Sequence, residues 1–249
     1  MASLTEIVSW CDQTLEKSLF SDYCPNGLQV EGCPEVSRII AGVTACQALL
    51  DEAVAREADL VLVHHGYFWK GESSALTGMR RQRIKTLLSH DISLLAYHLP
   101  LDAHPQLGNN AMLADRLGIA VQSHFGKQDL ACAGELETAL SPEEMRQRIS
   151  QAVNREVLHV GHGPEQIKTL GWCTGAAQSY LESASELGLD AFISGEISEN
   201  TVHIAREQGI HYFAAGHHAT ERFGVQALGA RLADRFQLSY EFVDIDNPA

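Results

Sequence analysis

The chain has 249 residues, of which 45% are hydrophobic and 20% are charged, as is ordinary for a globular protein with one large core or two smaller ones. Its formal net charge of −14 argues against sequence-specific nucleic-acid binding, because contact with a polyanion needs a basic surface. No apolar run approaches the roughly 20 residues of a membrane-spanning helix. Residues 1–20 resemble neither a signal peptide nor a transit peptide, so we expect a cytoplasmic protein without a membrane partner.

The predicted elements form two similar series along the chain. Each series has an amphipathic helix, an apolar strand, a helix, a second strand, another helix, a third strand, and a final helix and strand. In the first series these elements fall at 4–20, 39–66, 80–91, 92–98 and 109–122. In the second they fall at 141–153, 167–196, 199–209, 210–217 and 225–243.

Matching residues support the repeat. Asp59 and Asp190 open the two second strands, and Gln47 and Gln178 are separated by the same interval. Alternating strands and helices predict an α/β fold. We therefore predict two related α/β units, residues 1–124 and 125–249, whose terminal elements could be exchanged between the two. Two generic strand–helix–strand units could also produce a similarity this weak.

Candidate metal ligands follow the predicted core strands at corresponding places. The third strand of each series ends in a histidine followed four residues later by an acid, His98 and Asp102 in the first series and His217 and Glu221 in the second. In an open α/β sheet, ligands bind beyond the carboxyl ends of the strands. Neutral imidazole and carboxylate are usual ligands of Zn, Fe and Mn. The spacing therefore predicts a metal site at this edge.

A histidine doublet, His64 and His65, ends the second strand of the first series. Successive side chains of an extended segment diverge, so these imidazoles would serve separate ions. Together with Asp102, His217 and Glu221 they exceed what one ion needs, so the sequence predicts two divalent ions about 3.5–4 Å apart. A single histidine at a strand end is more often structural, and the prediction depends on the doublet and both pairs together.

The other histidines have less support from their surroundings. His98 could be a metal ligand or a catalytic proton carrier, and His218 could support the ligands or be structural. The rest are predicted to be surface or packing residues: His90, His104, His124, His159, His162, His203 and His211.

The connection at 67–85 is longer in the first series than its counterpart in the second. It holds aromatic and basic side chains, namely Tyr67, Phe68, Trp69, Lys70, Arg80, Arg81, Arg83 and Lys85. These side chains could bind an anionic or planar ligand beside the metals, or form a solvated helix face with the aromatics in a subunit contact. Phosphate-binding glycine loops and the Gly-x-Ser-x-Gly nucleophile motif are absent.

Several stretches together resemble the GTP cyclohydrolase I type 2 homologues, or Nif3-like proteins, and most closely the bacterial YbgI-type branch. These stretches are SDYCPNGLQVEG, GVTACQALLDEA, VHHGYFWKG, HLPLDAHPQLGNN, SGEISE and AGHHATER. The resemblance spans nearly the whole chain. It implies two interlocked α/β domains with a dinuclear metal centre in the cleft between them, and a ring-shaped homohexamer. By motif, it places the metal ligands at His64, His65, Asp102, His217 and Glu221.

The leading functional hypothesis is a dinuclear metal-dependent hydrolase that acts on a nucleotide or similar small anionic substrate, with His98 as a catalytic residue. The two ions could be Fe, Mn or Zn. The first alternative is a non-catalytic metal-binding ring scaffold or regulatory interaction protein. The second is a di-iron redox enzyme. A family resemblance transfers a site more securely than a reaction, so whether the protein is an enzyme stays open at this stage.

Overall fold

The computed structural model describes all 249 residues, which form two compact units. Unit 1 comprises Met1–Leu101 and Gly224–Asp246, and unit 2 comprises Asp102–Phe223 and Asn247–Ala249. These units differ from the predicted halves, because residues 102–124 lie in unit 2 and residues 224–246 lie in unit 1. Each unit thus contains the final helix and strand of the other series, and the duplication itself stays a hypothesis.

Unit 1 is built on a five-stranded sheet with the strand order β13-β4-β5-β6-β2. The first four of these strands are parallel, and β2 lies antiparallel to β6 at the edge. Their bounds are β2 (Gly27–Val30), β4 (Arg38–Thr44), β5 (Leu60–His65), β6 (Ser93–Ala96) and β13 (Ser239–Phe242). A separate pair, β1 (Ala2–Ser3) and β3 (Glu35–Val36), is antiparallel.

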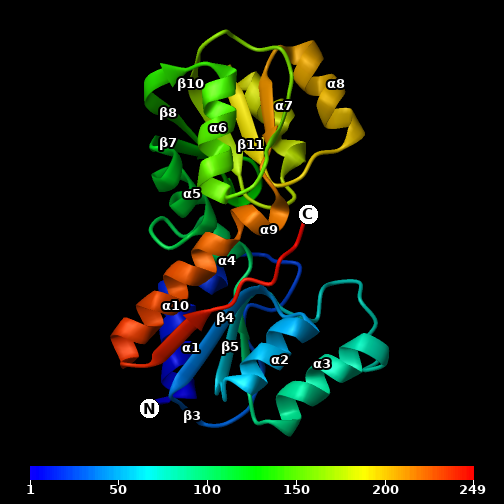
Figure 1. Cartoon of the computed structure of the whole chain (residues 1–249), viewed down its shortest axis with the longest axis vertical. Coiled ribbons are helices and arrows are strands. Elements are labelled where there is room, and N and C mark those ends of the chain that lie inside the picture. Colours follow the sequence, from blue (N-terminus) through cyan, green and yellow to red (C-terminus); the bar gives the residue numbers. More distant parts are fainter. The chain divides into compact units, whose positions relative to one another are not determined.

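Helices cover both faces of the unit 1 sheet (Figure 1). On one face, α2 and α3 bury Leu49, Leu50 and Leu87 against strand residues. On the other, Trp10 of α1 contacts Phe236 of α10 edge to face at 6.2 Å. Strand β5 is buried on both sides, which explains its unbroken apolar run. The helices are α1 (Leu4–Thr14), η1 (Lys17–Leu19), α2 (Gln47–Ala55), α3 (Gly78–Ser89) and α10 (Arg222–Phe236).

Unit 2 has a six-stranded sheet with the order β7-β8-β10-β11-β12-β9, in which the three strands β10, β11 and β12 are parallel. This parallel set corresponds to β4, β5 and β6 in the repeat predicted from sequence. The strands are β7 (Ile119–Phe125), β8 (Ala131–Leu140), β9 (Leu158–Val160), β10 (Ile167–Cys173), β11 (Ala191–Ser194) and β12 (His211–Ala214).

The helices of unit 2 also lie on both sides of its sheet. Leu113 of α5 and Met145 of α6 belong to one core that includes the fully buried Trp172 of β10. Helices α7 and α8 contact each other, away from α5 and α6 (Figure 1). The bounds are α4 (Leu99–Ala103), α5 (Asn109–Leu117), η2 (Lys127–Asp129), α6 (Pro142–Val153), η3 (Gln178–Tyr180), α7 (Leu181–Glu186), α8 (Glu199–Gln208) and α9 (His217–Thr220).

Local sequence signals explain where two of these helices begin. Ser141 caps α6 by accepting a hydrogen bond from the Glu144 backbone, and the Glu144 carboxylate accepts the Ser141 N–H, a capping box behind Pro142. A proline lies near the start of the second of these helices, at Pro100. It lies in the first turn of α4, where a helix tolerates proline because the N–H has no partner within the helix. No helix is long and apolar enough to cross a membrane.

Candidate metal centre

Unit 1 brings three predicted site histidines together at the carboxyl ends of its parallel strands. His64 and His65 end β5, and His98 follows β6. Ring nitrogens of the three lie within 4.8 Å of one another. The ring centroids of His64 and His65 are 4.6 Å apart, and that of His98 is 5.1 Å from His64. The parallel register of β5 and β6 produces this convergence. The rings of the doublet lie close together and do not diverge as we expected for successive residues of an extended segment.

Hydrogen bonds fix the orientation of two of these imidazole rings. His64 Nδ1 donates to the carbonyl oxygen of Tyr97 at 2.9 Å. A carbonyl can only accept, so Nδ1 carries the proton and Nε2 carries the lone pair. His65 Nδ1 lies 3.2 Å from the Thr44 hydroxyl at the end of β4. Such bonds to the ring nitrogen remote from an ion orient metal-binding histidines.

His98 forms a dyad with Asp22, a residue that the sequence reasoning missed. Their Nδ1 and Oδ1 atoms are 2.7 Å apart. The same carboxylate accepts bonds from Asn26 Nδ2 at 2.8 Å and from the Leu99 N–H at 3.0 Å. Burial raises the pKa of Asp22, but the bonds and charge of His98, with the bonds from Asn26 and Tyr23, lower it to about 2. Asp22 therefore stays ionised and holds the proton on Nδ1 of His98.

Unit 2 brings together one histidine and two carboxylates. His217 begins the single turn α9 and Glu221 follows its last residue, and His217 Nε2 lies 3.1 Å from Glu221 Oε2. Carboxylate oxygens of Asp102 and Glu221 lie within 4.8 Å of each other. Asp102 and Glu221 are only 6% and 3% exposed. Two buried carboxylates this close repel each other unless a proton or a cation lies between them.

A second carboxylate holds the other nitrogen of His217. Glu196, in the loop after β11, approaches Nδ1 at 2.7 Å. Burial lowers the pKa of His217, but the hydrogen bond and charge of Glu221, joined by those of Glu196, raise it to about 9. With an ion on Nε2 in place of a proton, Glu196 would keep Nδ1 protonated and the ring oriented.

Asp102 is held by buried polar neighbours on one of its oxygens. Its Oδ1 accepts a hydrogen bond from Asn109 Nδ2 at 2.8 Å and from the Thr174 hydroxyl at 3.2 Å. Asn109 is fully buried at the start of α5. Because both donors form hydrogen bonds with Oδ1, the carboxylate has a fixed orientation, as a metal ligand requires.

Gly175 is a further residue of this site that sequence patterns did not single out. Its φ of +69° is strained for any residue with a side chain, and a Cβ there would lie 2.1 Å from Glu221 Oε1 and 3.3 Å from His217 Nε2. Its N–H donates to the Thr220 hydroxyl at 3.1 Å. A glycine is needed here so that backbone and carboxylate can approach each other.

The residues present fit divalent metal ions. Imidazole nitrogens and carboxylate oxygens are the donors of Zn, Fe and Mn sites, and the hydrogen bonds described above orient them as in such sites. The 3.1 Å between His217 Nε2 and Glu221 Oε2 allows both atoms to reach one ion at about 2.0–2.2 Å. A second group in unit 1, Asp22, Cys24 and His98, also has its donor atoms within 4.8 Å of one another.

The aromatic and basic connection lies partly against the unit 1 histidines. The Trp69 ring meets His98 edge to face at 5.0 Å and His65 at 5.9 Å. Phe68 is 40% exposed with a φ of +65°, whereas Tyr67 is buried. Beyond them, residues 71–79 are all exposed.

Four of the basic residues of this connection lie in α3. Arg80 pairs with Glu72 at 2.5 Å, and Arg81 and Lys85 are exposed. Of the whole connection, the Trp69 ring is thus the side chain seen in contact with the candidate ligands.

Two of the histidines predicted to be surface or packing residues are hydrogen-bonded to each other in the structure. His159 Nε2 and His211 Nδ1 are 2.9 Å apart, and His211 Nε2 donates to the Pro164 carbonyl at 2.9 Å. The antiparallel pairing of β9 with β12 joins them. They lie 52 residues apart along the chain, so no local spacing could have revealed the pair.

These features define an α/β protein with clustered donors of the metal-binding kind. The Duf34/NIF3 (NGG1p interacting factor 3) family model matches residues 2–248, and the chain belongs to this family. A GTP cyclohydrolase 1 type 2 homolog from Vibrio cholerae is 56% identical over 243 residues, covering 95% of this chain and 96% of that protein. Its counterpart in Escherichia coli is 52% identical over 246 residues, covering 98% and 99%.

Solved structures agree with this assignment. The protein ybgI superimposes with a TM-score of 0.97 at 52% identity over all of both chains. A protein from Thermus thermophilus gives 0.88 at 31% identity, again over all of both chains. Reduced HcgD from Methanocaldococcus jannaschii gives 0.86 at 22% identity over 98% of each chain, which shows the shared fold alone.

Proposed function

We propose that the protein is a dinuclear metal-dependent hydrolase whose two donor sets hold one pair of ions in a cleft between two interlocked domains. The unit 1 set supplies His64 and His65, and the unit 2 set supplies Asp102, His217 and Glu221. The observation that carries the proposal is the presence in each unit of converging donors whose remote atoms are hydrogen-bonded. Five ligands exceed the needs of one ion, which favours two.

When bound, two divalent ions would supply Lewis acidity and lower the pKa of a water to near 7. The protein's own residues would position the metal ligands and transfer protons during the reaction. Glu196 and the Tyr97 carbonyl hold His217 and His64 in one tautomer. His98 is the catalytic residue of the proposal: Asp22 holds its Nδ1 proton, so Nε2 can accept a proton from the attacking water and pass it to the leaving group.

The substrate class follows from the side chains beside the histidines. We infer a small anionic substrate with a planar group, of which a nucleotide is the leading example. Trp69 and the half-exposed Phe68 offer aromatic faces, while Lys70 and Arg81 are exposed cations in the same connection. The relatives' name, GTP cyclohydrolase 1 type 2 homolog, is consistent with a nucleotide but does not supply the reaction.

We further propose that copies of the chain assemble into a ring-shaped hexamer. Strand β7 is an edge strand whose residues 120–124 are all exposed, including Val121 at 45%. A long exposed edge of this kind is a ready site for pairing with another copy. Light scattering coupled to size exclusion tests this: a mass of one or two chains would contradict the hexamer.

The test of the hydrolase proposal combines metal content with turnover. Anaerobically purified protein is reconstituted with Fe, Mn or Zn, assayed for metal, and screened against normal and damaged nucleotides. His64→Ala and Glu221→Ala should lose metal and turnover together. The matched control is His203→Ala, at an exposed histidine of α8, which should change neither. Turnover that survives complete metal loss, or full metal occupancy without turnover of any substrate, would contradict a metal-dependent hydrolase.

A further inference from the structure

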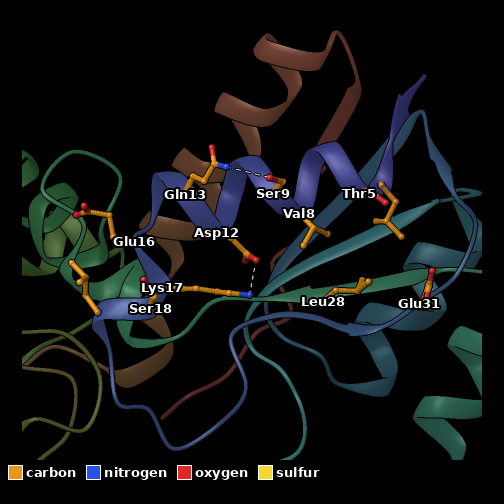
Figure 2. Close-up of a pocket in the computed structure, with 12 residues that line it drawn as sticks. Thr5, Val8, Ser9, Asp12, Gln13, Glu16, Lys17, Ser18, Leu28 and Glu31 are labelled. Atoms are coloured by element: carbon orange, nitrogen blue, oxygen red, sulfur yellow. Dashed lines mark hydrogen bonds and ion pairs between the residues drawn. The ribbon is translucent and has the colours of Figure 1, made fainter.

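A groove in unit 1 lies between α1 and the edge strand β2, apart from the donor residues described above. Its volume is about 650 Å³, within the roughly 300–1,000 Å³ typical of binding sites. One face of α1, the residues of η1, and Leu28 and Glu31 line it. Figure 2 shows Val8, Asp12 and Lys17 directed into the space that Leu28 borders from the opposite side.

Four apolar side chains contribute to the walls of the groove, among polar ones. Leu4 and Val8 lie one helical turn apart on α1, and Leu28 faces them from β2. Leu19, at the far end, is 70% exposed. Val8 and Leu28, which lie opposite each other, are suited to burying apolar side chains of a partner.

The charge of the groove is negative. Both oxygens of the Asp12 carboxylate already have partners in the chain. Its Oδ2 pairs with Lys17 Nζ at 2.5 Å, and its Oδ1 accepts a hydrogen bond from the Tyr97 hydroxyl at 2.6 Å. Lys17 is therefore neutralised. Glu16 and Glu31 remain as exposed carboxylates at the rim, so a cationic partner would be complementary.

The third feature is the free edge of the sheet. Strand β2 pairs with β6 on one side only and ends the sheet order, so its other side has no strand partner beside the groove. Its register with β6 shifts between Leu28 and Val30, so the outward backbone groups there do not alternate regularly. An extended segment can add a strand at such an edge while its alternate side chains enter an adjacent groove.

We propose that this groove binds an extended segment of a partner protein in which apolar and basic side chains alternate, by strand addition to β2. The backbone of the segment pairs with β2, its apolar side chains pack against Val8 and Leu28, and its basic side chains meet Glu16 and Glu31. The proposal is independent of the metal centre.

The probe is a fluorescein-labelled heptapeptide of alternating lysine and valine, titrated with the full-length chain and followed by fluorescence anisotropy. Saturable binding is expected, with slower amide hydrogen exchange at residues 27–31. Glu16→Lys/Glu31→Lys should weaken binding by roughly tenfold or more. The matched control, Glu6→Lys/Glu57→Lys, makes the same charge change at exposed positions outside the groove and should bind within about twofold of the unsubstituted protein.

Two further peptides separate strand addition from charge attraction. The same heptapeptide with alternate backbone nitrogens methylated along one edge should lose binding, and a glutamate–valine heptapeptide should not bind. Equal binding of methylated and unmethylated peptides, or equal weakening by both pairs of substitutions, would overturn the proposal. It would also be overturned if Glu16→Lys/Glu31→Lys changed the oligomeric mass while peptide binding was absent, because a second copy would then be the occupant.

Discussion

Nε2 of His217 and Oε2 of Glu221 lie 3.1 Å apart because α9 places residues i and i+4 on one face of a single turn. This contact joins an imidazole to a carboxylate that is only 3% exposed, and Glu196 holds the other side of the ring. In the sequence, the four-residue interval between the two already suits one face of a helical turn. The consequences of the surrounding hydrogen bonds can be tested one residue at a time.

The first prediction concerns Glu196. Glu196→Gln keeps the shape of the side chain but weakens its bond to His217 Nδ1, so metal affinity should fall by about 10- to 100-fold. Competition with a metal-binding dye measures the affinity. Glu199→Gln, at an exposed carboxylate three residues along, is the control and should leave it unchanged. Equal affinities for all three proteins would show that Glu196 does not orient the ring.

A second prediction compares two glycines. Both Gly175 and Gly188 have φ near +70°, but a Cβ at Gly188 meets nothing within 4 Å. Gly188→Ala should cost roughly 1–2 kcal/mol from backbone strain. Gly175→Ala should cost a further 1–3 kcal/mol, roughly, because the new Cβ displaces the Glu221 carboxylate.

Urea unfolding of the metal-free proteins measures this difference between the glycines, and metal titration measures the displacement of Glu221. The Gly175 variant alone should lose metal affinity. If both variants are destabilised equally and both retain metal, the close approach of Gly175 to Glu221 does not matter.

His98 and Asp22 provide a third prediction. If His98 carries a proton and is not a ligand, His98→Ala should retain both ions while turnover of any identified substrate falls by about 10²- to 10⁴-fold. Asp22→Asn should also lower turnover, since it removes the negative charge that holds the proton on His98 Nδ1. Metal analysis beside the turnover assay distinguishes the roles: loss of an ion from the His98 variant would make that residue a ligand.

The paired histidines of unit 2 give a pH-dependent prediction. Burial and the neighbouring His211 lower the pKa of His159; Glu143 of α6 opposes the shift, while Arg146 and His162 add to it. Because the unfolded state then binds more protons than the folded state below about pH 6.5, unfolding free energy should fall as pH drops from about 7 to 5. Denaturant unfolding of His159→Gln should show a shallower decline, whereas exposed His203→Gln should not. Parallel profiles for all three would contradict the role of His159.

Local and periodic features of the fold could be predicted from sequence. An unbroken apolar run indicates strand β5, and a capping box indicates the start of α6. The four-residue interval between His217 and Glu221 is typical of residues that meet on one face of a helix. The parallel strands then had to bring His64, His65 and His98 to one sheet edge, since carboxyl ends of parallel strands meet there.

Features set by long-range packing could not be predicted. Asp22 lies 76 residues from His98 along the chain, and no spacing rule connects them. Gly175 becomes significant only through the position of Glu221. Residues 224–246 belong to unit 1 because β13 pairs with β4. From the sequence alone, β13 could equally well have been placed in the sheet of the second unit. Tertiary pairing, not local preference, decides such cases.

The pairing of two ions is tested most directly by X-ray absorption at the metal edge of the anaerobically reconstituted protein. We expect nitrogen and oxygen neighbours with a histidine signature, and a second metal at about 3.5–4 Å. His65→Ala and Glu221→Ala should each abolish the metal–metal signal. Fully loaded protein in which every ion lacks a metal neighbour would contradict the account.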